Sequence, residues 1–147
     1  MRSAESIKKF ALELNALSRI LKKEGMYVGY HCHGFDFRKV GEKTAWELLF
    51  SQTLPEVIMQ LDFGNCAAGG GDPIKILKEF PGRAKSVHVK DWPKAPLKKG
   101  SEVWEEIFKL CLKLHRTQWF VVEQGERGGN DLEIPKKSIE IVKTYIS

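Results

Sequence analysis

The sequence predicts an α/β protein in which parallel βα units follow one another along the chain. Short apolar runs of strand length alternate with amphipathic stretches of helix length. The runs recur at intervals of roughly thirty residues, which is the length of a βα crossover unit. Because such crossovers place neighbouring strands in the same direction, the four strands and about five helices should form one parallel sheet with helices packed beside it.

A helix, a strand and a second helix are predicted at the start of the chain. Residues 4–24 carry apolar side chains at three- and four-residue intervals, which is the pattern of an amphipathic helix. Residues 26–30 are a short apolar run that leads to His31 and predicts the first strand. Thr44 and Glu47 have the spacing of a capping box, in which both side chains bind backbone N–H groups at a helix start. The second helix should therefore begin at Thr44.

Three more strand–helix units follow. The predicted strands cover 57–61, 85–90 and 119–122, and the predicted helices start at Asp72, cover 103–114 and cover 139–146. Asp72 has the side chain of an N-cap residue, and Pro73 stands at the first helical position, where its missing N–H costs nothing. The glycines at 69–71 precede this cap. Since the Asp72 carboxylate competes for the N–H groups that a phosphate would need, we interpret them as a tight turn.

Composition indicates a single globular domain over residues 1–147, because a hydrophobic content of 42% is enough for a buried core. The lysines behind the net charge of +5 are scattered along helices and turns, so nucleic acid is not an expected partner. Three widely spaced cysteines offer neither a disulfide framework nor a paired zinc module. The N-terminal residues lack the apolar core of a secretory signal and no segment approaches a membrane span. We therefore expect a cytoplasmic protein without a membrane partner.

Side chains of metal-ligand type stand at the ends of the predicted strands. His31, with His33 two residues on, follows the first strand, and Asp62, His88 and Glu123 mark the ends of the others. The carboxyl ends of parallel strands lie at one edge of the sheet, so these side chains should converge. Burying two carboxylates without compensation costs several kcal/mol. A divalent metal ion would compensate them, and mutual ion pairs or water would do so too.

The stretches around these strand ends also carry a family resemblance. They are GYHCHGFDF (residues 29–37), LDFGNCAAGGGDP (61–73), VHVKD (87–91) and VVEQ (121–124). In this order they resemble the sugar phosphate isomerase/epimerase family, the xylose isomerase-like TIM barrels, over nearly the whole chain. The resemblance implies half of a TIM (β/α)8 barrel, namely its C-terminal half. It also implies one divalent metal ion (Mn, Zn, Co, Fe or Mg) held between side chains of successive strands.

The resemblance assigns the metal ligands by position. It implies Asp62, His88 and Glu123 as three of them. Many family members have a glutamate in the first place, where this chain has His31, and Asp36 is a nearby substitute. The ligand set is therefore His31 or Asp36 with the other three. Mixed nitrogen and oxygen ligands favour Mn, Fe, Co or Zn over Mg or Ca.

The activity that the resemblance implies is isomerisation or epimerisation of a sugar, a sugar phosphate or a sugar-like polyol through an ene-diolate. The metal polarises a carbonyl and a neighbouring hydroxyl, one group removes the carbon-bound proton between them, and a second group returns it. We expect Glu123 to remove the proton and His31 or His33 to act across the substrate. Lys90, on the same strand face as His88, would stabilise the developing oxyanion. A one-base isomerisation or an elimination reaction also fits this set.

The predicted strands are too few for a complete barrel. A closed TIM barrel needs eight strands and about 250 residues, whereas this chain has four predicted strands in 147 residues. The open edges of a half-barrel predict a homo-oligomer or a separate chain that supplies the N-terminal half. A fragment of a longer protein, or a non-catalytic remnant, would also explain the length.

AP endonucleases share this fold, so DNA repair is a further alternative. We rank it lowest. Their trinuclear zinc site needs a further His after the strand-end Asp, where this chain has Asn65, and an Asp-x-His element that does not occur here. Other features are interpreted as structural. His115 lies late on a predicted helix, where a cation suits the helix dipole, and we assign it no chemistry. Gly125, Gly128 and Gly129 are interpreted as part of a surface loop.

Overall fold

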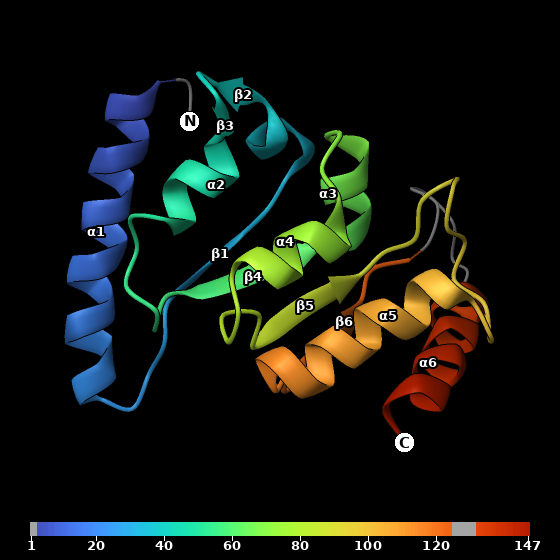
Figure 1. The fold of residues 1–147 in the computed structure, drawn as a ribbon. Coiled ribbons are helices and arrows are strands. Elements are labelled where there is room, and N and C mark those ends of the chain that lie inside the picture. Colours follow the sequence, from blue (N-terminus) through green and yellow to red (C-terminus); the bar gives the residue numbers. More distant parts are fainter. Residues whose placement is uncertain (1–2, 125–131) are drawn as a thin grey trace.

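The computed structural model describes residues 3–124 and 132–147. Its main feature is a four-stranded parallel sheet in the order β1-β4-β5-β6. The strands are β1 (Gly29–His31), β4 (Ile58–Asp62), β5 (Ser86–Val89) and β6 (Trp119–Val122). Each strand pairs with the next parallel strand along the chain, and helices lie between them in sequence (Figure 1). This arrangement confirms the predicted half of an α/β TIM barrel.

Six α-helices are found in the described part of the chain. They are α1 (Ala4–Lys23), α2 (Ala45–Phe50), α3 (Phe63–Ala68), α4 (Pro73–Glu79), α5 (Glu102–Leu110) and α6 (Glu133–Ile146). The smaller elements are the 3-10 turn η1 (Gly34–Phe37), the π-helical turn η2 (Cys111–His115), and a hairpin of β2 (Lys39–Val40) and β3 (Lys43–Thr44). In Figure 1, α4 and α5 lie in front of the sheet and α1 stands beyond β1.

Local capping explains where two of these helices begin. Thr44 Oγ1 accepts a hydrogen bond from the Glu47 N–H at 3.1 Å, and the Glu47 carboxylate accepts one from the Thr44 N–H at 2.7 Å. This is the predicted capping box at the start of α2. Asp72 Oδ1 accepts hydrogen bonds from the N–H groups of Ile74 and Lys75, so its carboxylate occupies the start of α4 as predicted.

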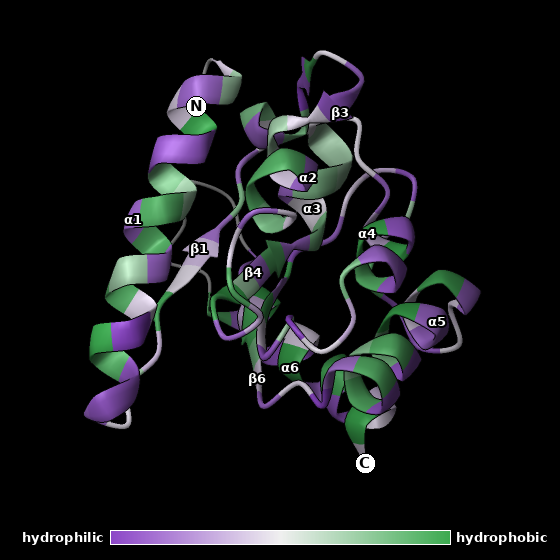
Figure 2. Ribbon diagram, turned by 60° about the vertical axis from the view of Figure 1, so that its left-hand side comes forward, coloured by the Kyte–Doolittle hydropathy of each residue, from purple (hydrophilic) through white to green (hydrophobic). Residues whose placement is uncertain are grey.

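The core lies between one face of the sheet and the helices. Alternate strand residues point into it, and these side chains are fully buried: Met59, Leu61, Val87 and Val89. The largest buried side chains beside them are aromatic: Trp46, Phe50, Phe63, Trp104 and Phe108. Figure 2 shows hydrophobic and hydrophilic residues alternating along α1, as expected for a helix that buries one face. The helices therefore cover this face of the sheet.

The other face of the sheet is open in the described part of the chain. Trp119 is 68% exposed and Val121, which pairs with His88 in the strand register, is 39% exposed. Further in, Gln60 Nε2 donates a hydrogen bond to Ser86 Oγ at 2.7 Å. Among residues 3–124 and 132–147, β1 pairs with β4 alone and β6 with β5 alone, so each of these two strands has an unpaired edge there. Closure of a barrel would cover this face and both edges.

Most element boundaries lie within a few residues of the sequence prediction, and three differences have a clear reason. The first strand is shorter than predicted, because Met26 and Tyr27 are 51% and 71% exposed and β1 begins at Gly29. Residues 63–68 form α3 where we expected only a turn, since so short a helix does not show helical periodicity. The last helix begins at Glu133, before the apolar stripe that predicted it.

Three further sequence predictions concern membrane spans, the glycine loop and the domain organisation. Within residues 3–124 and 132–147, no helix is both long enough and apolar enough to cross a bilayer. The predicted surface loop with Gly125, Gly128 and Gly129 lies outside the described residues. The single domain over residues 1–147 stays a prediction.

Candidate metal centre

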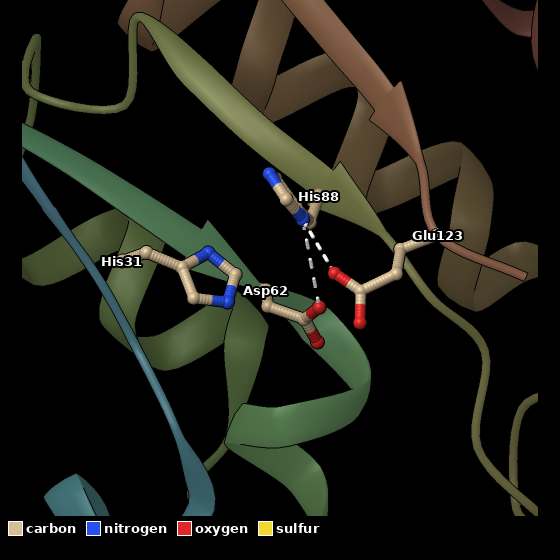
Figure 3. A group of neighbouring side chains, drawn as sticks. All are labelled: His31, Asp62, His88 and Glu123. Atoms are coloured by element: carbon tan, nitrogen blue, oxygen red, sulfur yellow. Dashed lines mark hydrogen bonds and ion pairs between the residues drawn. The ribbon is translucent and has the colours of Figure 1, made fainter.

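Four of the predicted side chains meet at the carboxyl end of the sheet. One ligand atom each from His31, Asp62, His88 and Glu123 lies within 4.8 Å of all the others, and Figure 3 shows the side chains pointing toward one another. Asp62 lies directly opposite His88 in the register of β4 and β5. His31 ends β1, and Glu123 follows the last residue of β6. The parallel pairing of the strands therefore brings the four side chains together.

Asp62 is the most buried member of the group, with no exposed surface. Its Oδ1 accepts a hydrogen bond from the Asn65 N–H at 2.6 Å, so it is also the N-cap of α3. Its Oδ2 is buried and has no hydrogen-bond partner in the described residues. Burial raises the pKa of Asp62, and the hydrogen bond from Asn65 opposes this shift. One carboxylate oxygen is thus held in place while the other faces the group unpaired.

The Glu123 carboxylate contacts two side chains, His88 and Lys90. Its Oε2 lies 2.7 Å from His88 Nδ1, and its Oε1 accepts a hydrogen bond from Lys90 Nζ at 2.8 Å. The hydrogen bond from Lys90 is the largest cause that holds the pKa of Glu123 at about 2, with His88 contributing in the same direction. A carboxylate with so low a pKa is a weak proton acceptor. The ion pair with Lys90 therefore disfavours protonation of Glu123 in this arrangement.

His31 brings an imidazole ring to the group. Its Nδ1 is buried without a hydrogen-bond partner in the described residues. Its ring centroid lies 4.4 Å from that of His88 and 5.1 Å from that of His33. Burial, followed by the charge of His88, lowers the pKa of His31. The imidazole is therefore neutral near pH 7, which is the form that binds metals and accepts protons.

Asp36 and His33 occupy other places. Asp36 is fully buried, and both of its carboxylate oxygens lie 3.2 Å from the Tyr30 hydroxyl. Its Oδ2 also accepts a hydrogen bond from the His33 N–H at 2.9 Å, so it anchors the η1 turn. Of the two alternatives for the first ligand, the structure brings His31 and not Asp36 to the other three. The His33 ring lies beside His31 and stacks on Phe35, at 5.3 Å and an interplanar angle of 2°.

Two contributors were missed in the sequence. Asn65 Oδ1 accepts a hydrogen bond from Lys90 Nζ at 3.3 Å, and Asn65 Nδ2 donates one to the Cys32 carbonyl at 3.1 Å. Cys32 Sγ accepts a hydrogen bond from the Asp62 N–H at 3.1 Å, and burial raises the pKa of the thiol to about 12. The only available signal was the three-residue spacing from Asp62 to Asn65, which is that of an N-cap and its partner.

The donor set fits one divalent cation. It offers two imidazoles and two carboxylates, a mixed set that suits Mn, Fe, Co or Zn. The unpaired Asp62 Oδ2 and His31 Nδ1 are the kind of buried polar atoms that a ligand would satisfy, and His88 Nδ1 lies 4.0 Å from that Asp62 oxygen. Mutual pairing satisfies part of the group, because His88 Nδ1 contacts Glu123 Oε2 at 2.7 Å, whereas its ion pair with Asp62 Oδ2 is too long for a hydrogen bond.

Comparison with known proteins places this geometry in a family. The family model for the xylose isomerase-like TIM barrel matches residues 2–145. A solved sugar phosphate isomerase/epimerase from Parabacteroides distasonis ATCC 8503 superposes with a TM-score of 0.76 at 25% sequence identity, covering 99% of this chain and 55% of that one.

Two of the curated relatives are named as inosose dehydratases. An inosose dehydratase 2 from Bacillus cereus is 27% identical over 144 residues, which cover 81% of this chain and 47% of that protein. An inosose dehydratase from Clostridium tetani is 36% identical over 90 residues, which cover 59% of this chain and 29% of that protein. The chain thus spans about half the length of the first of these relatives. It belongs to the xylose isomerase-like TIM barrel family.

Proposed function

We propose that this chain is the metal-binding half of an enzyme that acts on a sugar or sugar-like polyol by moving a carbon-bound proton beside a carbonyl group. The observation that carries the proposal is the group of four donor side chains around the buried, unpaired Asp62 Oδ2. His31, Asp62, His88 and Glu123 would hold one divalent ion, which when bound polarises the carbonyl and an adjacent hydroxyl of the substrate.

Proton transfer is the task of the side chains around this group. A base takes the proton from the carbon between carbonyl and hydroxyl, and the released electron pair moves onto the carbonyl oxygen to give an ene-diolate. Lys90 donates a hydrogen bond to this oxygen, and in leaving Glu123 it makes that carboxylate a stronger base. His33, or His31 when it is protonated and not bound to the ion, then supplies a proton from the other side. Delivery of the proton to the former carbonyl carbon, while the hydroxyl proton passes to the former carbonyl oxygen, gives isomerisation, and delivery to the opposite face of the original carbon gives epimerisation.

Dehydration is a second candidate reaction, favoured by the relatives named inosose dehydratase. The first step is the same removal of a proton beside a carbonyl. The electron pair then expels a hydroxyl group from the next carbon, and His33, once protonated, supplies the proton that makes this group leave as water. Both reactions therefore share the site and differ in the fate of the ene-diolate or enolate.

Completion of the barrel is part of the same proposal. The open edges of β1 and β6, and the match to about half of the solved relative, support a second half-barrel, supplied by another copy, by a separate N-terminal half-barrel chain or by the rest of a longer protein. We place the assembled enzyme in the cytoplasm, since the three free cysteines are buried and unpaired. A non-catalytic half-barrel is the competing interpretation, and it would take up no metal.

Metal content, measured together with solution mass, tests the proposal. Purified protein should contain one divalent ion per completed site, and Glu123→Ala should lose it. The reaction is tested by incubating hydroxyketone sugars and cyclic polyol ketones in D2O with the metal-loaded protein and following deuterium uptake at carbon by NMR. Isomerisation retains all atoms of the substrate, whereas dehydration releases one water. Full activity in protein stripped of metal would contradict the proposal.

A further inference from the structure

Asn65 connects three separate parts of the candidate centre. Its backbone N–H donates to Asp62 Oδ1 at 2.6 Å, and its side-chain Nδ2 donates to the Cys32 carbonyl at 3.1 Å. Its Oδ1 accepts from Lys90 Nζ at 3.3 Å. The amide orientation is assigned from these partners, because a carbonyl needs a donor and an ammonium needs an acceptor. Each polar group of Asn65 thus serves a different strand end.

The ammonium of Lys90 is held from two sides as a result. Asn65 Oδ1 lies on one side and Glu123 Oε1, at 2.8 Å, on the other. The second oxygen of Glu123 contacts His88 Nδ1 at 2.7 Å. A continuous line of hydrogen bonds therefore runs from the end of β1 through Asn65 and Lys90 to the ends of β5 and β6.

Glycines allow α3 to approach closely enough for these contacts. A Cβ at Gly64 would lie 2.7 Å from Lys90 Cγ and 3.0 Å from the Asp91 carbonyl oxygen. A Cβ at Gly69 would meet the backbone carbonyl of Gly34. Because neither residue has a side chain, α3 packs directly against both the Lys90 stem and the η1 turn. The position of Asn65 is thus fixed by backbone packing.

Only a side-chain amide satisfies both of the partners that Asn65 meets. An aspartate would accept from Lys90 but could not donate to the Cys32 carbonyl, and alanine would do neither. The backbone N–H remains in every such variant, so the hydrogen bond to Asp62 is kept. A substitution at Asn65 therefore isolates what the side chain does.

We propose that Asn65 is a positioning residue that fixes the Lys90 ammonium beside Glu123 and holds the end of β1 against α3. The proposal rests on the proposed function, because Lys90 is the oxyanion partner in that chemistry. Asn65 contacts neither the proposed ion nor the reacting atoms. Its effect on metal binding and catalysis is exerted through Lys90 and through the strand that carries His31.

The first experiment is a double-mutant cycle with Asn65→Ala, Lys90→Met and the double variant, read out as Co2+ affinity and as urea unfolding of metal-free protein. Asn65→Ala should weaken Co2+ binding about 10- to 100-fold, as is usual for residues that support ligands. Together the two substitutions should cost at least about fivefold less than the product of their single effects. Effects that multiply to within about twofold would overturn the link to Lys90.

The second experiment is hydrogen exchange of metal-free protein at residues 31–36. Exchange should be faster in Asn65→Ala than in wild type. Ala68→Gly is the matched control, because it weakens the same helix by about 1 kcal/mol without touching this network. Equal exchange rates in the two variants would show that Asn65 acts only through the stability of α3 and would overturn the inference. Wild-type protein that binds no Co2+ would instead overturn the proposed function, while exchange and unfolding still decide the role of Asn65.

Discussion

The two ends of the parallel sheet treat buried polar side chains in opposite ways. At the end where β5 begins, Arg83 and His115 are 8% and 0% exposed, and nearly all of their polar atoms bind backbone groups. At the carboxyl end, His31 Nδ1 and Asp62 Oδ2 are buried with no partner among the described residues. An unpaired buried polar group costs about 1–3 kcal/mol. Satisfied atoms therefore fit a structural role, whereas two open atoms within one group of metal-ligand side chains fit a place for a ligand.

His115 shows how fully the structural end is satisfied. Its Nδ1 accepts a hydrogen bond from the Ala84 N–H at 3.0 Å, and its Nε2 lies 2.9 Å from the Leu77 carbonyl. Burial lowers the pKa of His115, so the ring is neutral. The residue has a structural role, but our reason for expecting one was wrong. It does not act as an exposed cation at a helix end, since it is buried and uncharged.

Arg83 closes the loop between α2 and β4. Its Nη1 and Nη2 atoms donate to the backbone carbonyls of Phe50, Thr53, Leu54 and Val57 and to Thr53 Oγ1. Its Nε is the exception, with no partner in the described residues. The guanidinium thus satisfies carbonyls that would otherwise be buried and unpaired.

The largest expected effect lies at this structural end. Arg83→Met keeps an apolar stem but leaves several buried carbonyls without a donor, so the free energy of unfolding should fall by about 3–5 kcal/mol. Urea unfolding measures the change. Metal affinity of the folded fraction should stay the same. A decrease in the free energy of unfolding below about 1 kcal/mol would show that water replaces the guanidinium. The two ends of the sheet would then differ less than we infer.

Asp62→Asn should have the next largest effect, at the carboxyl end. Asparagine keeps the N-cap acceptor for the Asn65 N–H but removes the charge, so metal affinity should fall by more than about 100-fold. Because burial raises the pKa of Asp62, the charge opposes folding of the metal-free protein. The free energy of unfolding at pH 7 should therefore be unchanged or higher. Retention of equimolar metal after dialysis would contradict this.

Lys90→Met should change the ionisation of Glu123. Without the ammonium, the pKa of Glu123 should rise from about 2 toward 4.5, as followed by carbon NMR of the carboxyl group in metal-free protein. In the wild type, the ion pair adds stability above pH 4.5 that is lost as the pH falls toward about 2, so the variant should show a flatter acid limb. Lys75→Met is the control, since Lys75 lies 3.5 Å from Glu47 and not near Glu123. An unshifted Glu123 would show that His88 alone sets its pKa.

His115 should give the smallest effect, in the pH dependence of stability. Because its folded-state pKa lies below 6.5, the unfolded chain binds the proton more readily. The stabilisation is complete above pH 6.5 and is lost as the pH falls toward the folded-state pKa, at about 1.4 kcal/mol for each unit between the two values. His115→Asn should remove the contribution of His115 to this pH dependence, as measured by urea unfolding at several pH values. Part of the pH dependence should persist, because the pKa of His31 is also lowered. An unchanged pH dependence of the free energy of unfolding in His115→Asn would show that another group causes it.

The sequence allowed the sheet and the meeting of four side chains to be predicted, because both depend on local signals. Apolar runs mark the strands, and the ends of parallel strands lie together. The choice between His31 and Asp36 could not be made, since the turn after β1 decides which side chain faces the sheet end. That turn directs Asp36 to the Tyr30 hydroxyl. The role of Asn65 could not be predicted from the sequence either, because it depends on contacts with residues far along the chain.

The exposed indole of Trp119 gives the open sheet an optical signal. Trp46 and Trp104 are fully buried, whereas Trp119 is 68% exposed on the side where the second half-barrel would lie. In the isolated chain, its fluorescence should be red-shifted and readily quenched by acrylamide, and docking of a second half should shift the emission toward the blue. Barrel assembly can therefore be titrated without a label, and Trp119→Phe should silence the response.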